Sequence, residues 1–193
     1  MTDGTPGRSR RARRGVTFTE LLVACALVGI LAAAAVPRVD TLRLRAEGSA
    51  QLVRGTLQLA QRLAVQHQFD VVVGFDVAGG RMRVTEDRNN DGDPGADRVR
   101  WVPLDAGVRF AAPATPVPGG TGAAAVVLSR VRTVGGLPSV IFHRGGSASA
   151  ALEVYLVATR GARQDVRAVT VVQGTGRTTR FRLLGGGWQE ADL

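Results

Sequence analysis

One carboxylate, that of Glu20, stands at the start of a long apolar segment. The residues that follow it, "LLVACALVGILAAAAV" at 21–36, include no charged side chain. An ionised side chain next to lipid is costly in free energy, so it commonly pairs with an opposite charge and has a function. The placement of Glu20 therefore predicts ion pairing in a medium of low dielectric constant, and its partner has to be found elsewhere.

The segment "EDRNNDGDPGAD" (86–97) is rich in side-chain oxygen atoms. Its residues follow the alternate spacing of an EF-hand-like calcium loop, with Gly92 between the candidate ligands Asp87, Asn89, Asp91 and Asp93. However, the twelfth position of that pattern is Arg98 instead of a bidentate glutamate, and Asp97 lies one place early. No helix is expected on either side. We interpret the segment as a solvated turn rich in Asp and Asn, with calcium binding as the alternative.

The segment "GTGRTTRFR" (174–182) predicts a basic hairpin. Arg180 and Arg182 share one face of the expected strand, and Arg177 lies at the turn. Clustered arginines can bind phosphate groups in a salt-sensitive manner that does not depend on base sequence. The alternative is that these arginines only form the polar face of a strand. Arginine is the usual basic residue of this chain, since the sequence contains no lysine.

The overall charge does not by itself demand an anionic partner. The formal net charge is +9, and the first fifteen residues contribute five arginines against one aspartate. The rest of the chain is therefore only mildly basic, which is compatible with anionic ligands without requiring them.

The residues that usually carry catalysis are few. Cys25 is the single cysteine and lies in the apolar run, which excludes an intramolecular disulfide and a cysteine metal site. His67 and His143 are the only histidines, too few for a histidine-based metal site. No nucleophile-elbow motif is present. We predict a protein that is not an enzyme, with no catalytic residues and no cofactor apart from the calcium alternative.

The basic residues 8–14 followed by the apolar run allow three interpretations. The first is a secretory signal with small residues, Ala33 and Ala35, before the cut. The second is a plain membrane anchor, and the third is a segment cut before its apolar part, which then stays on the mature protein. Residues 16–36 would span about 31 Å as a helix, enough to cross a bilayer core. Only the third interpretation explains both Glu20 and the Arg-Gly junction.

The stretch "RRGVTFTELLVACALVGILAAAAVP" (13–37) resembles the prepilin-type N-terminus of type IV pilins and type II secretion pseudopilins. In that family a prepilin peptidase cuts after a glycine, which corresponds to Gly15, and methylates the new first residue, which corresponds to Val16. The family's glutamate is the fifth mature residue and its helix-bending proline the twenty-second, matching Glu20 and Pro37. Val16 is a mild departure, because the first mature residue is usually phenylalanine.

This resemblance implies a partner for Glu20. Cleavage leaves a cationic amine on Val16 at the same level as the Glu20 carboxylate. When helices stack side by side, Glu20 of one subunit can pair with the amine of its neighbour, which removes two isolated charges and fixes the axial register. The alternative is a glutamate at the membrane interface without a partner.

After Pro37 the sequence predicts a helix followed by β-structure. Apolar residues recur at three- or four-residue steps through 38–69, which is typical of an amphipathic helix. From Asp70 the period changes to two, and the turn "AGG" (78–80) predicts a hairpin. Further strands are expected at 99–104, 108–111, 139–143, 151–158, 167–172 and 178–183. The Pro/Gly/Ala-rich segment 111–125 is expected to be a loop without a core element.

We therefore predict an α+β fold in which a long N-terminal helix, membrane-spanning in its first half and amphipathic in its second, packs on antiparallel β-sheets. The element order is similar to that of the H-type minor pseudopilins and FimT-type minor pilins, the GspH/FimT family. The supporting pieces are "AQLVRGTLQLAQRLAVQHQ" (50–68), "VVVGF" (71–75), "DRVRWV" (97–102), "VIFHRGGSAS" (140–149) and "VTVVQGTGRTTRFRL" (169–183).

The resemblance implies four parts: a cytoplasmic leader (1–15), a transmembrane helix (16–37), an amphipathic periplasmic helix (38–69) and a periplasmic β-rich domain (70–193). The implied function is that of a minor pseudopilin near the tip of a type II secretion pseudopilus, anchored in the inner membrane with its N-terminus in the cytoplasm. Implied partners are other major and minor pseudopilins, prepilin peptidase, the inner-membrane secretion platform and exported proteins.

The alternative is a FimT-like minor pilin that binds DNA for uptake or primes pilus assembly. Some FimT-type pilins bind DNA through a C-terminal Gly-Arg-X-Arg element. The corresponding residues here would be Arg177, Arg180 and Arg182, but "GRTTR" has one residue too many between its arginines.

Overall fold

The computed structural model describes residues 17–35, 41–89, 98–160 and 163–191. The chain divides into two compact units, residues 1–40 and residues 41–193, which are described separately. Gly15, Val16 and Pro37 lie outside the described residues.

The first unit contains helix α1 (Phe18–Ala35). Thr17 caps its N-terminus, because its hydroxyl accepts a hydrogen bond from the backbone N–H of Glu20 at 3.3 Å. Glu20 lies in the first turn, where a negative charge interacts favourably with the helix dipole. The side chains of residues 18–31 are exposed. Within the described residues, no helix combines the length and the apolar character needed to cross a membrane.

The second unit begins with helix α2 (Thr41–His67). One face of this helix is buried from Ala46 to Ala64, through the residues Ala46, Ser49, Ala50, Val53, Thr56, Leu57, Ala60 and Ala64. Most of these side chains are small, so the helix can approach the strands beneath it closely. His67, the last residue of the helix, is exposed, and Gln68 follows it with a positive φ of 57°.

The first sheet has five strands in the order β3-β2-β1-β7-β6. Its members are β1 (Asp70–Asp76), β2 (Arg81–Asp87), β3 (Val99–Pro103), β6 (Thr133–Val134) and β7 (Leu137–Phe142). Strands β1 and β2 form the predicted hairpin, in which Asp76 is paired with Arg81 across the turn. All pairings in this sheet are antiparallel.

The second sheet has six strands and is also antiparallel. Its main order is β11-β10-β9-β8-β4, and β5 also pairs with β8. The strands are β4 (Val108–Phe110), β5 (Val126–Leu128), β8 (Leu152–Arg160), β9 (Arg163–Val171), β10 (Thr178–Leu184) and β11 (Gly187–Glu190).

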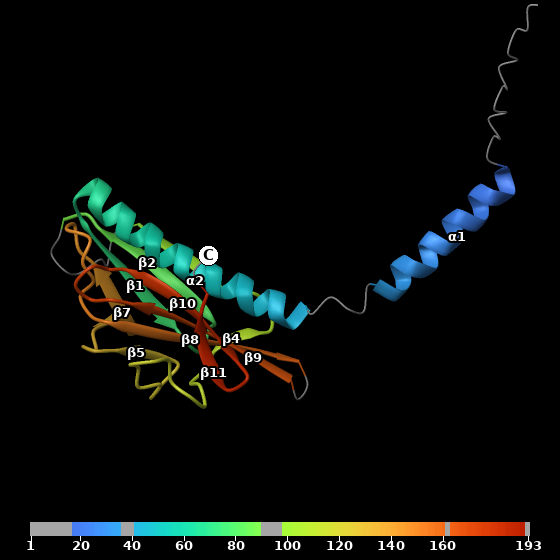
Figure 1. The fold of residues 1–193 in the computed structure, drawn as a ribbon. Helices are drawn as coiled ribbons and strands as arrows, with labels where there is room; N and C mark the ends of the chain where they lie inside the picture. The colour runs from blue at the N-terminus through green and yellow to red at the C-terminus, as the bar shows by residue number, and fades with distance from the viewer. Residues whose placement is uncertain (1–16, 36–40, 90–97, 161–162, 192–193) are drawn as a thin grey trace, which may run out of the picture. The chain divides into compact units, whose positions relative to one another are not determined.

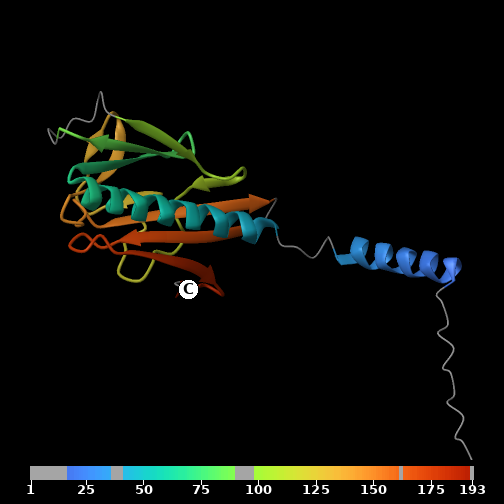
Figure 2. The same cartoon turned by 90° about the horizontal axis from the view of Figure 1, so that it is seen from above.

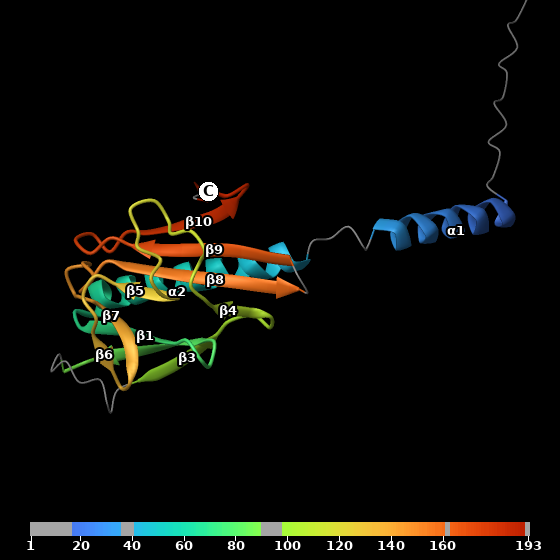
Figure 3. The ribbon, with the colours of Figure 1, turned by 90° about the horizontal axis from the view of Figure 1, so that it is seen from below.

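Helix α2 lies across both sheets, and Figures 1 and 2 show it running along β1 on one side and β9 and β10 on the other. The main core lies between them. Its centre contains Leu57 of α2, Phe75 of β1, Phe142 of β7 and Leu156 of β8, each fully buried. Figure 3, the view from below, shows the two sheets side by side under the helix. The predicted α+β class is therefore confirmed.

The short strands β5, β6 and β11 are not among the predicted ones. The segment 111–125 is indeed outside the strands, but the expectation that it contributes nothing to a core is wrong. Val117 is only 3% exposed and packs in a second, smaller core with Tyr155 and Ala168. That core lies on the face of the second sheet away from α2, so both faces of strands β8 and β9 are covered.

Candidate functional site

The N-terminal candidate residues are described only in part. Glu20 is exposed on α1, and its backbone N–H is held by Thr17. The predicted cleavage and methylation positions, Gly15 and Val16, and the helix-bending Pro37 lie outside the described residues, so their roles stay predictions. An exposed carboxylate in the first turn of an apolar helix is free to meet a cation on another chain.

The basic hairpin does not gather its three arginines on one free surface. Arg177 is exposed and lies 3.7 Å from a Glu190 carboxylate oxygen. Arg182 is half-buried and donates to the side-chain oxygen of Gln189 at 3.3 Å. Arg180 is only 4% exposed, because it turns toward α2 and pairs with Glu47. Its second amino group donates to the carbonyl of Ala191 at 2.7 Å.

Arg180 belongs to a charge cluster between helix and sheet. Glu47 of α2 accepts hydrogen bonds from Arg167 of β9 and Arg180 of β10. Arg167, 2% exposed, also pairs with Asp165 on its own strand. Two buried guanidinium groups thus share two carboxylates, which compensates much of the cost of removing these charges from water. The geometry assigns Arg180 a structural role and leaves Arg177 and Arg182 as the external charges of this hairpin.

The acidic loop is described at its beginning only. Asp87 ends β2 and is 2% exposed, and Asn89 is exposed. Asp91 and Asp93 lie outside the described residues. In the part of the chain that the structure describes, no group of three His, Cys, Asp or Glu side chains is placed to hold a metal ion. Calcium binding stays an untested alternative.

His143 follows strand β7, at its end, and contacts Asp70 at the start of β1. Its Nδ1 lies 2.8 Å from a carboxylate oxygen of Asp70. The two residues therefore connect the neighbouring strands β1 and β7 where they emerge from the sheet. A serine, a histidine and an aspartate can form a catalytic triad, but Ser139, His143 and Asp165 do not form one here. Ser139 is fully buried in the middle of β7, and Asp165 pairs with Arg167.

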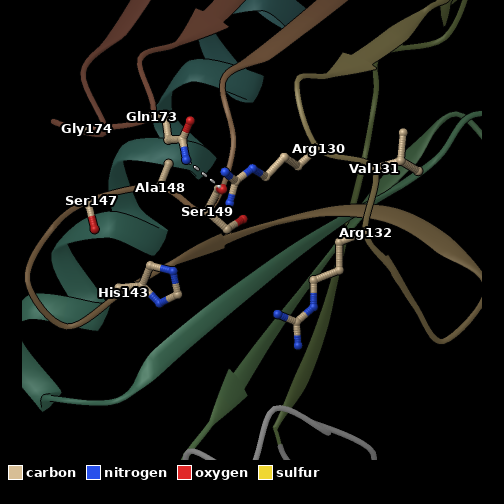
Figure 4. A pocket seen from close by; sticks show the side chains of 9 residues that line it. All are labelled: Arg130, Val131, Arg132, His143, Ser147, Ala148, Ser149, Gln173 and Gly174. Atoms are coloured by element: carbon tan, nitrogen blue, oxygen red, sulfur yellow. Dashed lines mark hydrogen bonds between the residues drawn. The ribbon is translucent and has the colours of Figure 1, made fainter.

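A pocket that the sequence analysis did not predict lies beside His143 (Figure 4). Its volume is about 790 Å³. Three segments line it: the β5–β6 connection with Arg130, Val131 and Arg132, the turn between β7 and β8, and the turn after β9. The only signal in the sequence was "RVR" (130–132), two arginines around an apolar residue in a connecting segment.

A second polar site fastens the loop 111–125 to the sheet. The hydroxyl of Tyr155 donates to Glu153 at 2.6 Å and accepts from the backbone N–H of Val117 at 3.2 Å. Glu153 also accepts the backbone N–H groups of Thr121 and Gly122. Burial, and next the hydrogen bond to Glu153, raise the pKa of Tyr155 to about 12. These contacts hold the loop over the second core.

Trp188 of β11 completes this attachment. Its indole N–H donates to the carbonyl of Thr115 at 3.0 Å, and its ring lies 6.0 Å from that of Tyr155. Trp188 therefore packs on the sheet as an anchor for the loop, with its ring against Tyr155 and its polar N–H satisfied by the loop backbone.

Comparisons with known proteins bear mainly on the N-terminus. Residues 10–36 match the family described as the prokaryotic N-terminal methylation motif. No curated protein matches the chain in sequence.

Among solved structures, two of the minor pseudopilin EpsH from the type II secretion system of Vibrio cholerae are similar to this chain. They share 13% and 12% sequence identity with it, at TM-scores of 0.38 and 0.41. Each alignment covers 76% of this chain, and 95% and 92% of the respective EpsH chains. The family match confirms the resemblance seen in residues 13–37, and the chain carries a prokaryotic N-terminal methylation motif.

Proposed function

We propose that this chain is a minor pseudopilin of a type II secretion system, a structural subunit of the pseudopilus that supports export of proteins across the outer membrane. The observation that carries the proposal is the methylation motif at 10–36, with Glu20 exposed in the first turn of the helix that follows. The α+β domain that follows, built on one long helix, agrees with a subunit of this type.

The proposed location follows from the same segment. Residues 16–37 insert in the inner membrane, the arginine-rich leader stays in the cytoplasm, and residues 38–193 lie in the periplasm. Prepilin peptidase removes residues 1–15 and methylates Val16. The assembled partners are major and minor pseudopilins and the inner-membrane secretion platform, and the position is near the tip of the filament.

Mass spectrometry of the protein from cells that express prepilin peptidase tests the processing step. The expected product begins at Val16 and carries one added methyl group, and a Gly15→Val variant keeps its leader. An intact leader in the unchanged protein, or a cut beyond Ala35, would contradict the proposal. The experiment reads the N-terminus alone and does not depend on the behaviour of the folded domain.

Assembly through Glu20 is tested by in-cell cross-linking between subunits. Glu20→Gln removes the charge that neutralises a neighbour's amine, so cross-linked species decrease by about tenfold, the ratio that a loss of about 1.4 kcal/mol produces. Glu20→Asp keeps the charge and serves as the matched control. Equal cross-linking in all three proteins would exclude a role for this carboxylate in assembly.

The DNA-binding alternative receives less support from the geometry. Of its three candidate residues, Arg180 is buried against Glu47, and Arg177 and Arg182 each have a partner on β11. A phosphate-binding surface gains affinity from several unpaired cations acting together. This hairpin offers two exposed or half-exposed guanidinium groups that are already engaged.

A further inference from the structure

The pocket beside His143 combines a fixed wall with two exposed arginines, Arg130 and Arg132, and the proposed filament role does not account for it. The wall is the turn between β7 and β8. Within it the backbone N–H of Ser149 donates to the carbonyl of Ile141 at 2.8 Å, and the Ser149 hydroxyl accepts the N–H of Ile141 at 3.0 Å. These bonds hold the turn in one conformation before any ligand arrives.

The same turn is tied to the end of β9. The backbone N–H of Ala148 donates to the carbonyl of Gln173 at 2.8 Å, and the side-chain amide of Gln173 donates to the carbonyl of Ser149 at 3.2 Å. Figure 4 shows this amide contact on the inner surface of the pocket. The wall is therefore preorganised, which lowers the entropic cost of binding there.

Opposite this wall stand Arg130 and Arg132. Both are exposed, and among the residues that the structure describes neither has a hydrogen-bond or ion-pair partner through its guanidinium group. The other arginines near carboxylates are paired, as Arg81 is with Asp76 and Arg177 with Glu190. Among the residues that the structure describes, none of those lining the pocket is a carboxylate. Within that part of the chain, the two cations therefore have no counter-charge in the pocket lining.

The pocket also offers apolar surface. Val131 lies between the two arginines in sequence and is 81% exposed, the highest value among the large apolar side chains described. An exposed apolar side chain flanked by guanidinium groups fits a ligand in which carboxylates alternate with apolar side chains.

We propose that this pocket binds an extended acidic peptide segment of a partner protein. Two carboxylates of the segment pair with Arg130 and Arg132, and an apolar side chain between them packs on Val131. Guanidinium groups form bidentate hydrogen bonds with carboxylates, which gives the contact directionality as well as charge. The fixed wall supplies hydroxyl groups from Ser147 and Ser149 along the path of the peptide.

A nucleic acid fits this site less well. Sequence-independent binding of DNA draws its affinity from about six to ten phosphate contacts along a continuous basic surface. The pocket provides two guanidinium groups in a hollow with an apolar component. A peptide can place a side chain into such a hollow, whereas a duplex backbone would lie across its opening.

The test uses the full chain in detergent and a short dye-labelled peptide in which aspartate alternates with valine, followed by fluorescence anisotropy. The unchanged protein is expected to bind this peptide and not the same peptide with asparagine in place of aspartate. Arg130→Ser and Arg132→Ser are each expected to weaken binding by about tenfold. Arg109→Ser is the matched control: it removes another exposed arginine, which lies on β4, pairs across the sheet with Val157 and does not line the pocket.

A charge-reversal variant distinguishes a lost ion pair from misfolding, because it is expected to gain binding to a peptide of the opposite charge. The double variant Arg130→Glu, Arg132→Glu is expected to bind a lysine–valine peptide and to lose the aspartate–valine peptide. Val131→Asp, at a position too exposed to affect folding, is expected to weaken aspartate–valine binding through its added charge.

The proposal is overturned if the unchanged protein fails to bind the aspartate peptide, if the asparagine peptide binds equally, or if Arg109→Ser has the same effect as the pocket variants. Binding of single-stranded DNA that is abolished by the pocket substitutions, without peptide binding, would replace the peptide with a nucleic acid. None of these outcomes depends on leader cleavage, so they can be distinguished from a failure of the proposed filament role.

Discussion

The carboxylate of Glu47 on helix α2 accepts a hydrogen bond from Nε of Arg167 on strand β9 at 3.1 Å. Its other oxygen accepts from Arg180 on β10. One helical side chain thus holds two neighbouring strands of the second sheet. Arg167 and Arg180 are almost fully buried, so both charges need compensation: Glu47 pairs with both of them, and Asp165 is a second partner for Arg167.

Glu47→Gln is expected to lower the free energy of unfolding by about 2 kcal/mol. Removing one member of a buried ion pair costs about 3–5 kcal/mol, and the effect is smaller here because Glu47 is itself one-third exposed. Chemical denaturation measures the change. Glu190→Gln is the matched control, since it removes a carboxylate from the exposed pair with Arg177 and should cost about 0.5 kcal/mol. Equal effects of the two substitutions would contradict a special role for Glu47.

Tyr155 is the single tyrosine of the chain, so its ionisation can be followed by ultraviolet difference absorbance. The expected midpoint is near pH 12 in the folded protein and near the ordinary value of 10.0 in denaturant. Since the folded pKa is the higher one, the folded state binds this proton more tightly. The resulting stability is complete below pH 10 and is lost as the pH rises through about 12.

A Glu153→Gln variant separates the two causes of this shift. The midpoint is expected to fall, because the negative acceptor beside the phenol is gone, but to stay above the unfolded value because burial is the larger cause. A midpoint unchanged by Glu153→Gln would show that the hydrogen bond of 2.6 Å does not influence the phenol.

Asp76 holds the turn of the β1–β2 hairpin. Its pKa lies below the ordinary value of 3.8, first because Arg81 donates a hydrogen bond at 2.8 Å and then because the backbone N–H of Gly79 does. With the folded pKa depressed, the stabilisation is present above pH 3.8 and is lost as the pH falls through the folded value. Arg81 also lies over the ring of Trp101, 4.0 Å from its centre.

Trp101 therefore reports the titration of Asp76. In a Trp188→Phe background, where Trp101 is the remaining tryptophan, its fluorescence is expected to change with a midpoint below pH 3.8. Adding Asp76→Asn should abolish this change. A midpoint at or above 3.8, or the same titration in the Asp76→Asn protein, would contradict the coupling between the turn and the ring.

The basic hairpin is expected not to bind DNA on its own. In gel-shift experiments with the full chain in detergent, we expect no shift of DNA by the protein with its natural sequence at moderate salt. The double variant Arg177→Ala, Arg182→Ala should give the same result, because neither protein binds. Arg180→Ala is not used, because it would remove one of the two arginines that pair with the Glu47 carboxylate. Salt-sensitive binding that these two substitutions remove would favour the DNA-uptake alternative.

Local pattern was enough to predict the long helix and the longer strands. The three- to four-residue spacing of Ala46, Ala50, Val53 and Leu57 predicts the buried face of α2, and these residues are fully buried. The alternation after Asp70 and the glycines at 79–80 predict the first hairpin. In such segments the periodicity itself is produced by burial on one face, so it can be read without knowledge of the rest of the fold.

The remaining features depend on contacts between distant residues. Strands β5, β6 and β11 have two to four residues each, too few to show a period. Arg180 reads as part of a polar strand face, and its burial arises from Glu47, 133 positions earlier. The pocket similarly joins residues of three separate connections, and "RVR" (130–132) alone does not reveal what lies opposite.

The position of Glu47 near the start of α2 has a mechanical consequence. It lies less than two turns from Thr41, where the chain enters this unit. Tension applied to the chain ahead of Thr41 would load the Glu47–Arg167 and Glu47–Arg180 bonds in shear before it reached most of the apolar contacts of the helix, which run from Ala50 to Ala64. These bonds would therefore contribute to the force at which α2 separates from the sheets, and single-molecule pulling should record a lower rupture force for Glu47→Gln.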